Sequence, residues 1–265
     1  METEFFVKLV SSFAVGAIWV AASTTIADRV GTKLGGLVAG LPSTVVVTLF
    51  FVGLTQGTAN ATLAASTVPI AFSINGPFLI VFCLLIRRGL VTALMGSLAP
   101  WLLLSVLIVQ HGLFYFGTAI TVWIATFVLT YWVLEYRLKI PSHIKSRQAP
   151  TRVQILLRAL LSGTIVAAGV FFSEIGGPIF GGLFASFPAV FLSALVIAYL
   201  SGGAEFSRAL AKSMMLSGFV NVVTYAIVGY LVFPLLGIWL GMMVGLLVTT
   251  GTGYLTLLVV RAKMV

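Results

Sequence analysis

Nine apolar segments separated by short breaks take up most of this sequence and restrict the folds that it can adopt. Their approximate bounds are 5–27, 34–56, 60–86, 89–110, 112–135, 154–173, 178–201, 208–233 and 236–260. A helix needs about 20 apolar residues to cross the hydrocarbon core of a membrane. Only 8% of the residues are charged, whereas a soluble domain has about 25%. We therefore expect an all-α polytopic membrane protein with nine transmembrane helices.

The distribution of basic residues supports this count. With nine crossings, every lysine and arginine except Lys8 falls on one side of the membrane. The positive-inside rule makes that side the cytoplasm. We expect a protein integral to the plasma (inner) membrane, with its N-terminus outside and its C-terminus in the cytoplasm. Membrane lipid is then the required partner, the net charge of +9 needs no nucleic acid, and a homo-oligomer is compatible with the sequence.

A block of small residues, a proline and an apolar helix occurs twice in the chain. The first copy is KLGGLVAGLPSTVVVTLFFVGLTQG, from Lys33 to Gly57, and the second is PIFGGLFASFPAVFLSALVIAYLSGG, from Pro178 to Gly203. Adding 146 to the residue numbers of the first copy superimposes it on the second without a gap. The chain therefore contains an internal repeat.

The repeat predicts how the chain is organised. Segments one to four are expected to correspond to segments six to nine, although the fourth and ninth share no clear residue match. The unmatched fifth segment then turns the second unit over in the membrane. We expect an N-terminal four-helix repeat at 1–111, a connecting helix and cytoplasmic linker at 112–153, and an inverted C-terminal four-helix repeat at 154–265. Inverted repeats are characteristic of secondary transporters.

The prolines of the two copies predict broken or kinked helices at Pro42 and Pro188. Proline removes a backbone donor and clashes with the preceding turn. A break would leave a helix N-terminus inside the membrane, where free N–H groups favour an anion or a carbonyl oxygen. The candidate substrate-binding residues at the two breaks are Gly40, Pro42, Ser43, Thr44, Ser186 and Pro188. The alternative is that the small residues serve close helix packing and that each proline only kinks a continuous helix.

Polar residues near the breaks complete the candidate site. Asn75 and Asn221 are paired by the same offset, and each lies in an apolar helix where an amide needs a partner. With Gly76, they are predicted to bind substrate, or else to join helices by hydrogen bonds. Asp28 and Glu174, also paired, are candidates for gating, with solvated helix-end charges as the alternative.

The sequence contains no motif of a common enzyme class. It has no HExxH, CxxC, P-loop or serine elbow. His111 and His143 fall on opposite sides of the predicted membrane, so they cannot share a metal ion. The single cysteine, Cys83, lies within an apolar segment. We therefore expect no enzyme activity, no catalytic residue, no metal and no cofactor.

The second copy of the block, GGLFASFPAVFLSALVIAYLSGG, resembles the GlpM-like small bacterial inner-membrane proteins. Those have a similar block of glycine, small residue, proline and apolar helix on a four-helix chain. The resemblance covers one helix in each half. It implies an integral membrane protein that is a fused, duplicated form of such a unit, and it indicates no substrate.

Together these features predict a secondary transporter or facilitator of a small solute, anionic or neutral, that works by alternating access between inverted repeats with discontinuous helices. One alternative is a translocase for a lipid or lipid phosphate, because the same helix ends suit a head group and the basic residues attract anionic lipid. A non-transporting membrane scaffold subunit is the second alternative.

Overall fold

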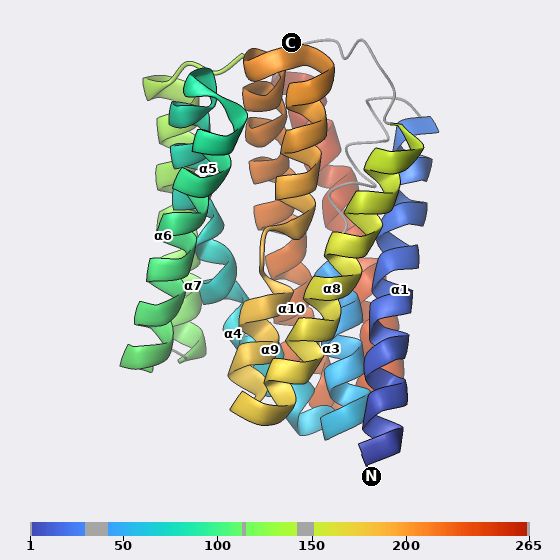
Figure 1. Ribbon diagram of the computed structural model, residues 1–265. Helices are drawn as coiled ribbons and strands as arrows, with labels where there is room; N and C mark the ends of the chain where they lie inside the picture. Colours follow the sequence, from blue (N-terminus) through green and yellow to red (C-terminus); the bar gives the residue numbers. More distant parts are fainter. Residues whose placement is uncertain (1, 30–41, 113–114, 142–150, 264–265) are drawn as a thin grey trace.

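The computed structural model describes residues 2–29, 42–112, 115–141 and 151–263, and in these ranges the chain is helical with no strand (Figure 1). The α-helices are α1 (Glu2–Arg29), α3 (Ser43–Gln56), α4 (Thr58–Ser73), α5 (Asn75–Leu85), α6 (Leu90–His111), α7 (Phe116–Trp132), α8 (Arg152–Gly176), α9 (Pro178–Ala185) and α10 (Ala189–Lys263). Two short elements, the 3-10 helix η1 (Ile86–Arg88) and the π-helix η2 (Val133–Arg137), extend α5 and α7. The all-α expectation is confirmed.

Several of these helices are long and apolar enough to cross a membrane. Six stretches of the described chain meet that criterion: Thr3–Ala22, Thr58–Arg88, Leu90–His111, Phe116–Arg137, Arg152–Gly176 and Pro178–Thr256. Ser43–Gln56 is a shorter apolar helix. The expected number of nine is not confirmed by this count. The last stretch is 79 residues long, and α10 leaves the helical conformation at Gly203 and Gly237.

The bundle has its two termini at opposite ends (Figure 1). α1 and α8 run along its length side by side, whereas α3 and α9 lie in the half that holds the N-terminus. α3 runs toward the N-terminal end, and the first part of α10 runs toward the C-terminal end. Gly57 ends α3 with φ 88°, and Gly203 interrupts α10 with φ 78°. Both turns require glycine, because other residues rarely adopt positive φ.

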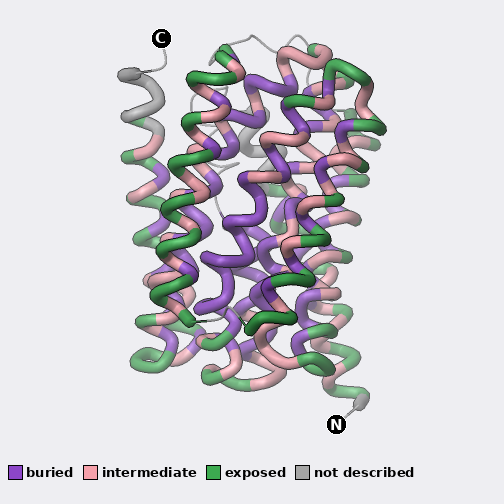
Figure 2. The backbone as a smooth tube through the Cα atoms, turned by 90° about the vertical axis from the view of Figure 1, so that its left-hand side faces the viewer, coloured by how far each residue is buried: buried purple, intermediate pink, exposed green. Residues whose placement is uncertain are grey.

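The core lies along α4, which packs against α9 and α10. Figure 2 shows buried residues in the middle of the bundle and exposed residues on its outer surface. Small side chains allow this close approach. A Cβ atom added to Gly182 of α9 would lie 2.3 Å from the carbonyl oxygen of Ala64 in α4. The packing role considered for the small residues is therefore present in the second copy of the block.

The outer surface of the bundle is apolar. Leu103 on α6, Leu157 on α8, and Leu235 and Leu247 on α10 are 60–79% exposed, and many other large hydrophobic side chains share this exposure. A protein surrounded by water rarely exposes contiguous apolar area of this extent. Lipid acyl chains would cover this apolar surface, in agreement with the expectation of a membrane protein.

Candidate functional site: a cavity between two helix breaks

The first predicted break is at Pro42, directly before α3, and residues 30–41 on its other side lie outside the described part of the structure. Pro42 has φ −76° and ψ 51°, outside the helical region, and α3 begins at Ser43. Its first intrahelical bond runs from the N–H of Val46 to the carbonyl of Pro42. The N–H groups of Ser43, Thr44 and Val45 therefore have no acceptor within the helix, and no side chain caps them. With 14 residues, α3 is about 21 Å long, which is shorter than the hydrocarbon core of about 30 Å.

The second break separates α9 from α10. α9 ends at Ala185 and α10 starts at Ala189, so the helix is interrupted at Pro188 and not merely kinked. The N–H of Leu192 makes the first helical bond of α10, to the carbonyl of Pro188 at 2.7 Å. Helix geometry consequently leaves the N–H groups of Val190 and Phe191 without an intrahelical acceptor.

The two breaks meet at one cavity of about 30 Å³. Since one water molecule needs about 10–15 Å³ of such space, the cavity accommodates only one or two water molecules, and any larger ligand requires the walls to move apart. The described residues that line the cavity are uncharged: Pro42, Ser43, Thr44, Phe72, Asn75, Ala185, Phe187, Pro188, Val190, Phe191, Gly218 and Val222. The cavity therefore joins the N-termini of α3 and α10 with the start of α5.

Side chains from α3 and α5 donate hydrogen bonds to the carbonyl groups at the C-terminal end of α9. The hydroxyl of Thr44 donates to the carbonyl of Ala185 at 3.4 Å. The Nδ2 atom of Asn75 donates to the carbonyl of Ser186 at 3.1 Å. Because that carbonyl can only accept, the orientation of the Asn75 amide is fixed. Its Oδ1 atom is fully buried and has no hydrogen-bond partner within the described chain.

The sequence therefore identified five of the residues around this cavity, namely Pro42, Ser43, Thr44, Asn75 and Pro188. Ser186 lies at the break, but its hydroxyl donates back to Gly182 within α9. Gly76 packs elsewhere, since an added Cβ would lie 2.3 Å from the hydroxyl of Thr130 in α7.

Asn221 differs from Asn75 in its surroundings. It is fully buried, and its Oδ1 accepts a hydrogen bond from Thr252 at 3.3 Å. It is not among the described residues that line the cavity, although Gly218 and Val222 on the same helix are. Gly40 and the side chain of Asp28 lie outside the described part of the structure.

Sequence reasoning missed the aromatic wall of the cavity, formed by Phe72, Phe187 and Phe191. The rings of Phe72 and Phe191 make an edge-to-face contact with centroids 5.9 Å apart. Helical spacing was the available signal for Phe72, because it lies three residues before Asn75 and so on the same helix face. Phe187 and Phe191 carried no comparable signal, since phenylalanine is common throughout this chain.

A polar pocket of about 280 Å³ lies at the ends of α3 and α8. Its lining residues are Thr55, Gln56, Asn60, Ser173, Glu174, Gly177 and Pro178. The hydroxyl of Ser173 donates to the side chain of Gln56 at 2.8 Å and links the two helices. Glu174, the described candidate for gating, therefore lies in this pocket and not at the cavity.

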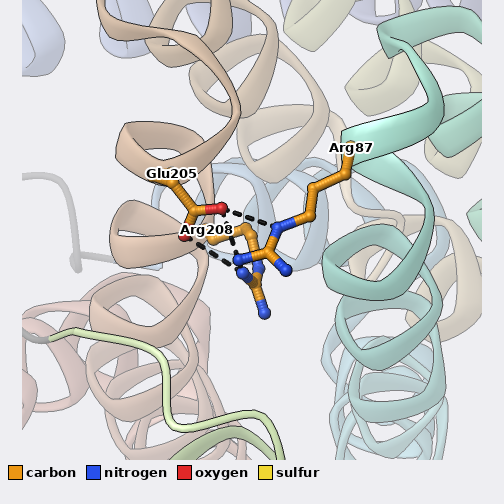
Figure 3. Close-up of polar contacts among 3 residues, drawn as sticks. All are labelled: Arg87, Glu205 and Arg208. Carbon is orange, nitrogen blue, oxygen red and sulfur yellow. Dashed lines mark hydrogen bonds and ion pairs between the residues drawn. The ribbon is translucent and has the colours of Figure 1, made fainter.

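Ion pairs occupy the opposite end of the bundle. The carboxylate of Glu205 on α10 lies 2.8 Å from Arg87 of η1 and 3.0 Å from Arg208 (Figure 3). Lys212 of α10 is buried and lies 2.5 Å from the carboxylate of Glu135 in η2. These contacts connect α10 with segments from the first half and the middle of the chain.

The residues that the structure describes form no group of three or more histidine, cysteine or acidic side chains that would hold a metal ion. Comparison with protein-family models, with curated proteins and with solved structures gives no match. The local geometry is therefore the basis for any assignment of function.

Proposed function

We propose that this protein is a secondary transporter or facilitator of a small solute, and that the solute binds between the breaks at Pro42 and Pro188. One observation carries the proposal: two helix N-termini and a buried amide surround a single cavity inside an apolar bundle. In lipid, backbone groups without hydrogen bonds are costly unless they line a cavity or a pathway. Discontinuous helices at the bilayer midplane are the usual substrate sites of secondary transporters.

The inverted-repeat organisation belongs to this proposal, with nine membrane segments. Dividing α10 at Gly203 and Gly237, treating α4 with α5 as one segment, and treating α9 with the first part of α10 as another gives a division of the described chain compatible with nine. The offset of 146 pairs Gly57 with Gly203, and both have positive φ. α3 and the first part of α10, which the same offset pairs, run in opposite directions. These relations support a second unit turned over relative to the first.

Alternating access requires that the cavity open toward one side of the membrane at a time. The ends of the bundle differ in chemistry, with the ion pairs of Glu205 at one end and the polar pocket near Glu174 at the other. We propose that the ion pairs restrict access from the C-terminal side, assigned to the cytoplasm. The pocket then lies on the outer side, where its polar side chains would hydrate an entering solute.

Uptake by proteoliposomes tests the proposal. Wild-type protein should accumulate one or more radiolabelled solutes from a panel of small anions and neutral polar compounds. Asn75→Leu should reduce this uptake at least about tenfold, because the helix would then carry no amide at the cavity. Thr48→Val is the matched control, since Thr48 is a buried polar residue of α3 that does not line the cavity. Its uptake should equal that of the wild type.

The alternatives have their own outcomes in the same vesicles. Flipping of a lipid head group without solute uptake would support a lipid or lipid-phosphate translocase, for which the two helix N-termini also suit a phosphate. Folded protein with neither activity would favour a scaffold subunit. A resemblance to the GlpM-like proteins is compatible with all three.

A further inference from the structure

We propose that the cavity binds a singly charged oxyanion that carries its own O–H group, such as a monoprotonated phosphate monoester. This inference rests on the proposed function and specifies the substrate class of the same site. The free compound and the head group of a lipid phosphate share this chemistry. Two properties of the cavity lead to the assignment: the partial positive charge of the helix N-termini, and the unpaired Oδ1 acceptor of Asn75.

The first property favours a single negative charge. The N-termini of α3 and α10 both lie at the cavity, and the N–H groups of Ser43, Thr44, Val190 and Phe191 have no acceptor within their own helices. Each helix N-terminus is equivalent to about half a positive charge, so together they match about one negative charge. Since no described lining residue is charged, a dianion would not be neutralised.

The second property requires a donor on the ligand. Asn75 is fully buried and lines the cavity, and its Oδ1 has no partner within the described chain. Its Nδ2 donates one hydrogen to the carbonyl of Ser186, so a flip that put the amide nitrogen in the position of Oδ1 would place the amide oxygen against that carbonyl oxygen. An anion without a proton would place an oxygen that can only accept next to Oδ1, which also only accepts, and the two would repel each other. An anion with one O–H group would instead donate to it.

The walls limit the remainder of the ligand. Phe72, Phe187 and Phe191 supply apolar ring surface to the cavity, which suits a small alkyl group or an acyl chain and not further polar groups. An added Cβ at Gly218 would lie 2.8 Å from the ring of Phe191. The ring of Phe191, which lies before the interruption of α10 at Gly203, therefore packs directly on the backbone of α10 at Gly218. Displacement of the Phe191 ring is the simplest way to enlarge the cavity.

The proton that the substrate carries is also relevant to how transport could be coupled to proton movement. None of the described residues that line the cavity has an acidic or basic side chain. A substrate that crosses as a monoprotonated anion brings its proton with it. Net movement of protons with the substrate would then need no titrating side chain in the cavity.

A matched pair of anions tests the assignment. Methyl phosphate at about pH 5 carries one P–OH group, because the second pKa of a phosphate monoester is about 6. Methyl sulfate has nearly the same size, shape and charge but no proton. We expect proteoliposomes to take up methyl phosphate at least about tenfold faster than methyl sulfate, since sites built to pair a ligand O–H discriminate strongly against analogues that lack it.

Variants and a lipid probe complete the design. Asn75→Leu should abolish the preference for methyl phosphate, and Thr48→Val should retain it. Vesicles that contain a fluorescent phosphatidic acid distinguish the two sources of the group. Flipping of this lipid with no uptake of methyl phosphate would indicate that the cavity binds the phosphate head group of a lipid and not the free compound.

The possible failures are separable. Equal uptake of methyl phosphate and methyl sulfate, or uptake of neutral solutes alone, overturns the inference and leaves the transport function intact. Preference for methyl phosphate that survives in Asn75→Leu overturns the role of the Asn75 acceptor. Folded protein that moves none of these solutes and does not flip the lipid overturns the proposed function as well.

Discussion

The side-chain nitrogen of Asn75 lies 3.1 Å from the carbonyl oxygen of Ser186, although the two residues are 111 positions apart in the chain. Asn75 is the first residue of α5, and Ser186 is the first residue after α9. Both are buried, at 0% and 1% exposure. The hydrogen bond satisfies a carbonyl that the break at Pro188 would otherwise leave without a partner.

We expect Asn75→Leu to lower the free energy of unfolding by about 1–3 kcal/mol, because it leaves the buried carbonyl of Ser186 unpaired. Unfolding of the purified protein in detergent micelles, followed by circular dichroism, measures the change. Thr48→Val is the control, since the Thr48 hydroxyl is buried without a partner in the described chain. It should leave stability unchanged or raise it, because it removes a buried hydroxyl that has no partner in the described chain. Equal losses for both variants would contradict the importance of the Asn75 hydrogen bond.

Gly182→Ala should destabilise the protein by more than about 3 kcal/mol or prevent folding, because a backbone clash cannot be relieved by a side-chain rotation. The new Cβ would lie 2.3 Å from the carbonyl oxygen of Ala64. Gly251→Ala provides the contrast, since nothing lies within 4 Å of its added Cβ. Alanine is favoured over glycine in a helix by about 1 kcal/mol, so this control should be neutral or more stable. Yield of monodisperse protein and thermal unfolding distinguish the two results.

Glu135→Ala should cost about 3 kcal/mol of stability, because it removes the carboxylate from the buried ammonium of Lys212. Arg87→Ala breaks a pair in which both side chains are largely exposed, and solvent screens such pairs so that they contribute little to stability. Thermal unfolding at low and high salt compares the variants. A larger loss of stability in Arg87→Ala than in Glu135→Ala would contradict the greater contribution of the buried ion pair.

Cysteine labelling tests the orientation in the membrane. In a background with Cys83→Ala, a membrane-impermeant maleimide should label Ala59→Cys from outside the cell and Ala204→Cys only from the cytoplasmic side. The two positions follow the turns at Gly57 and Gly203, which lie at opposite ends of the bundle. Labelling of both from one side contradicts the inverted organisation. Labelling with the sides exchanged contradicts only the assignment of the cytoplasmic end.

The positions of the helix breaks were predictable because they depend on local chemistry. A proline removes a donor wherever it stands in a helix, and the sequence pointed to Pro42 and Pro188 for that reason. The same logic extended to Ser43 and Thr44, which follow the first proline directly. It failed to separate Asn75 from Asn221, because both look alike in sequence, whereas only Asn75 lines the cavity.

The sequence by itself determined an all-α apolar chain, two prolines at which a helix would break or kink, and a repeated block with a proline at the centre. These properties follow from the solvation of side chains and from the backbone of single residues. Only the tertiary structure decided that the two breaks share one cavity, that Phe191 closes over Gly218, and that the Asn75 acceptor has no partner there. Pro42 and Pro188 are 146 positions apart, and Phe191 and Gly218 are 27 positions apart. Packing between helical stretches, which no local pattern encodes, establishes these relations.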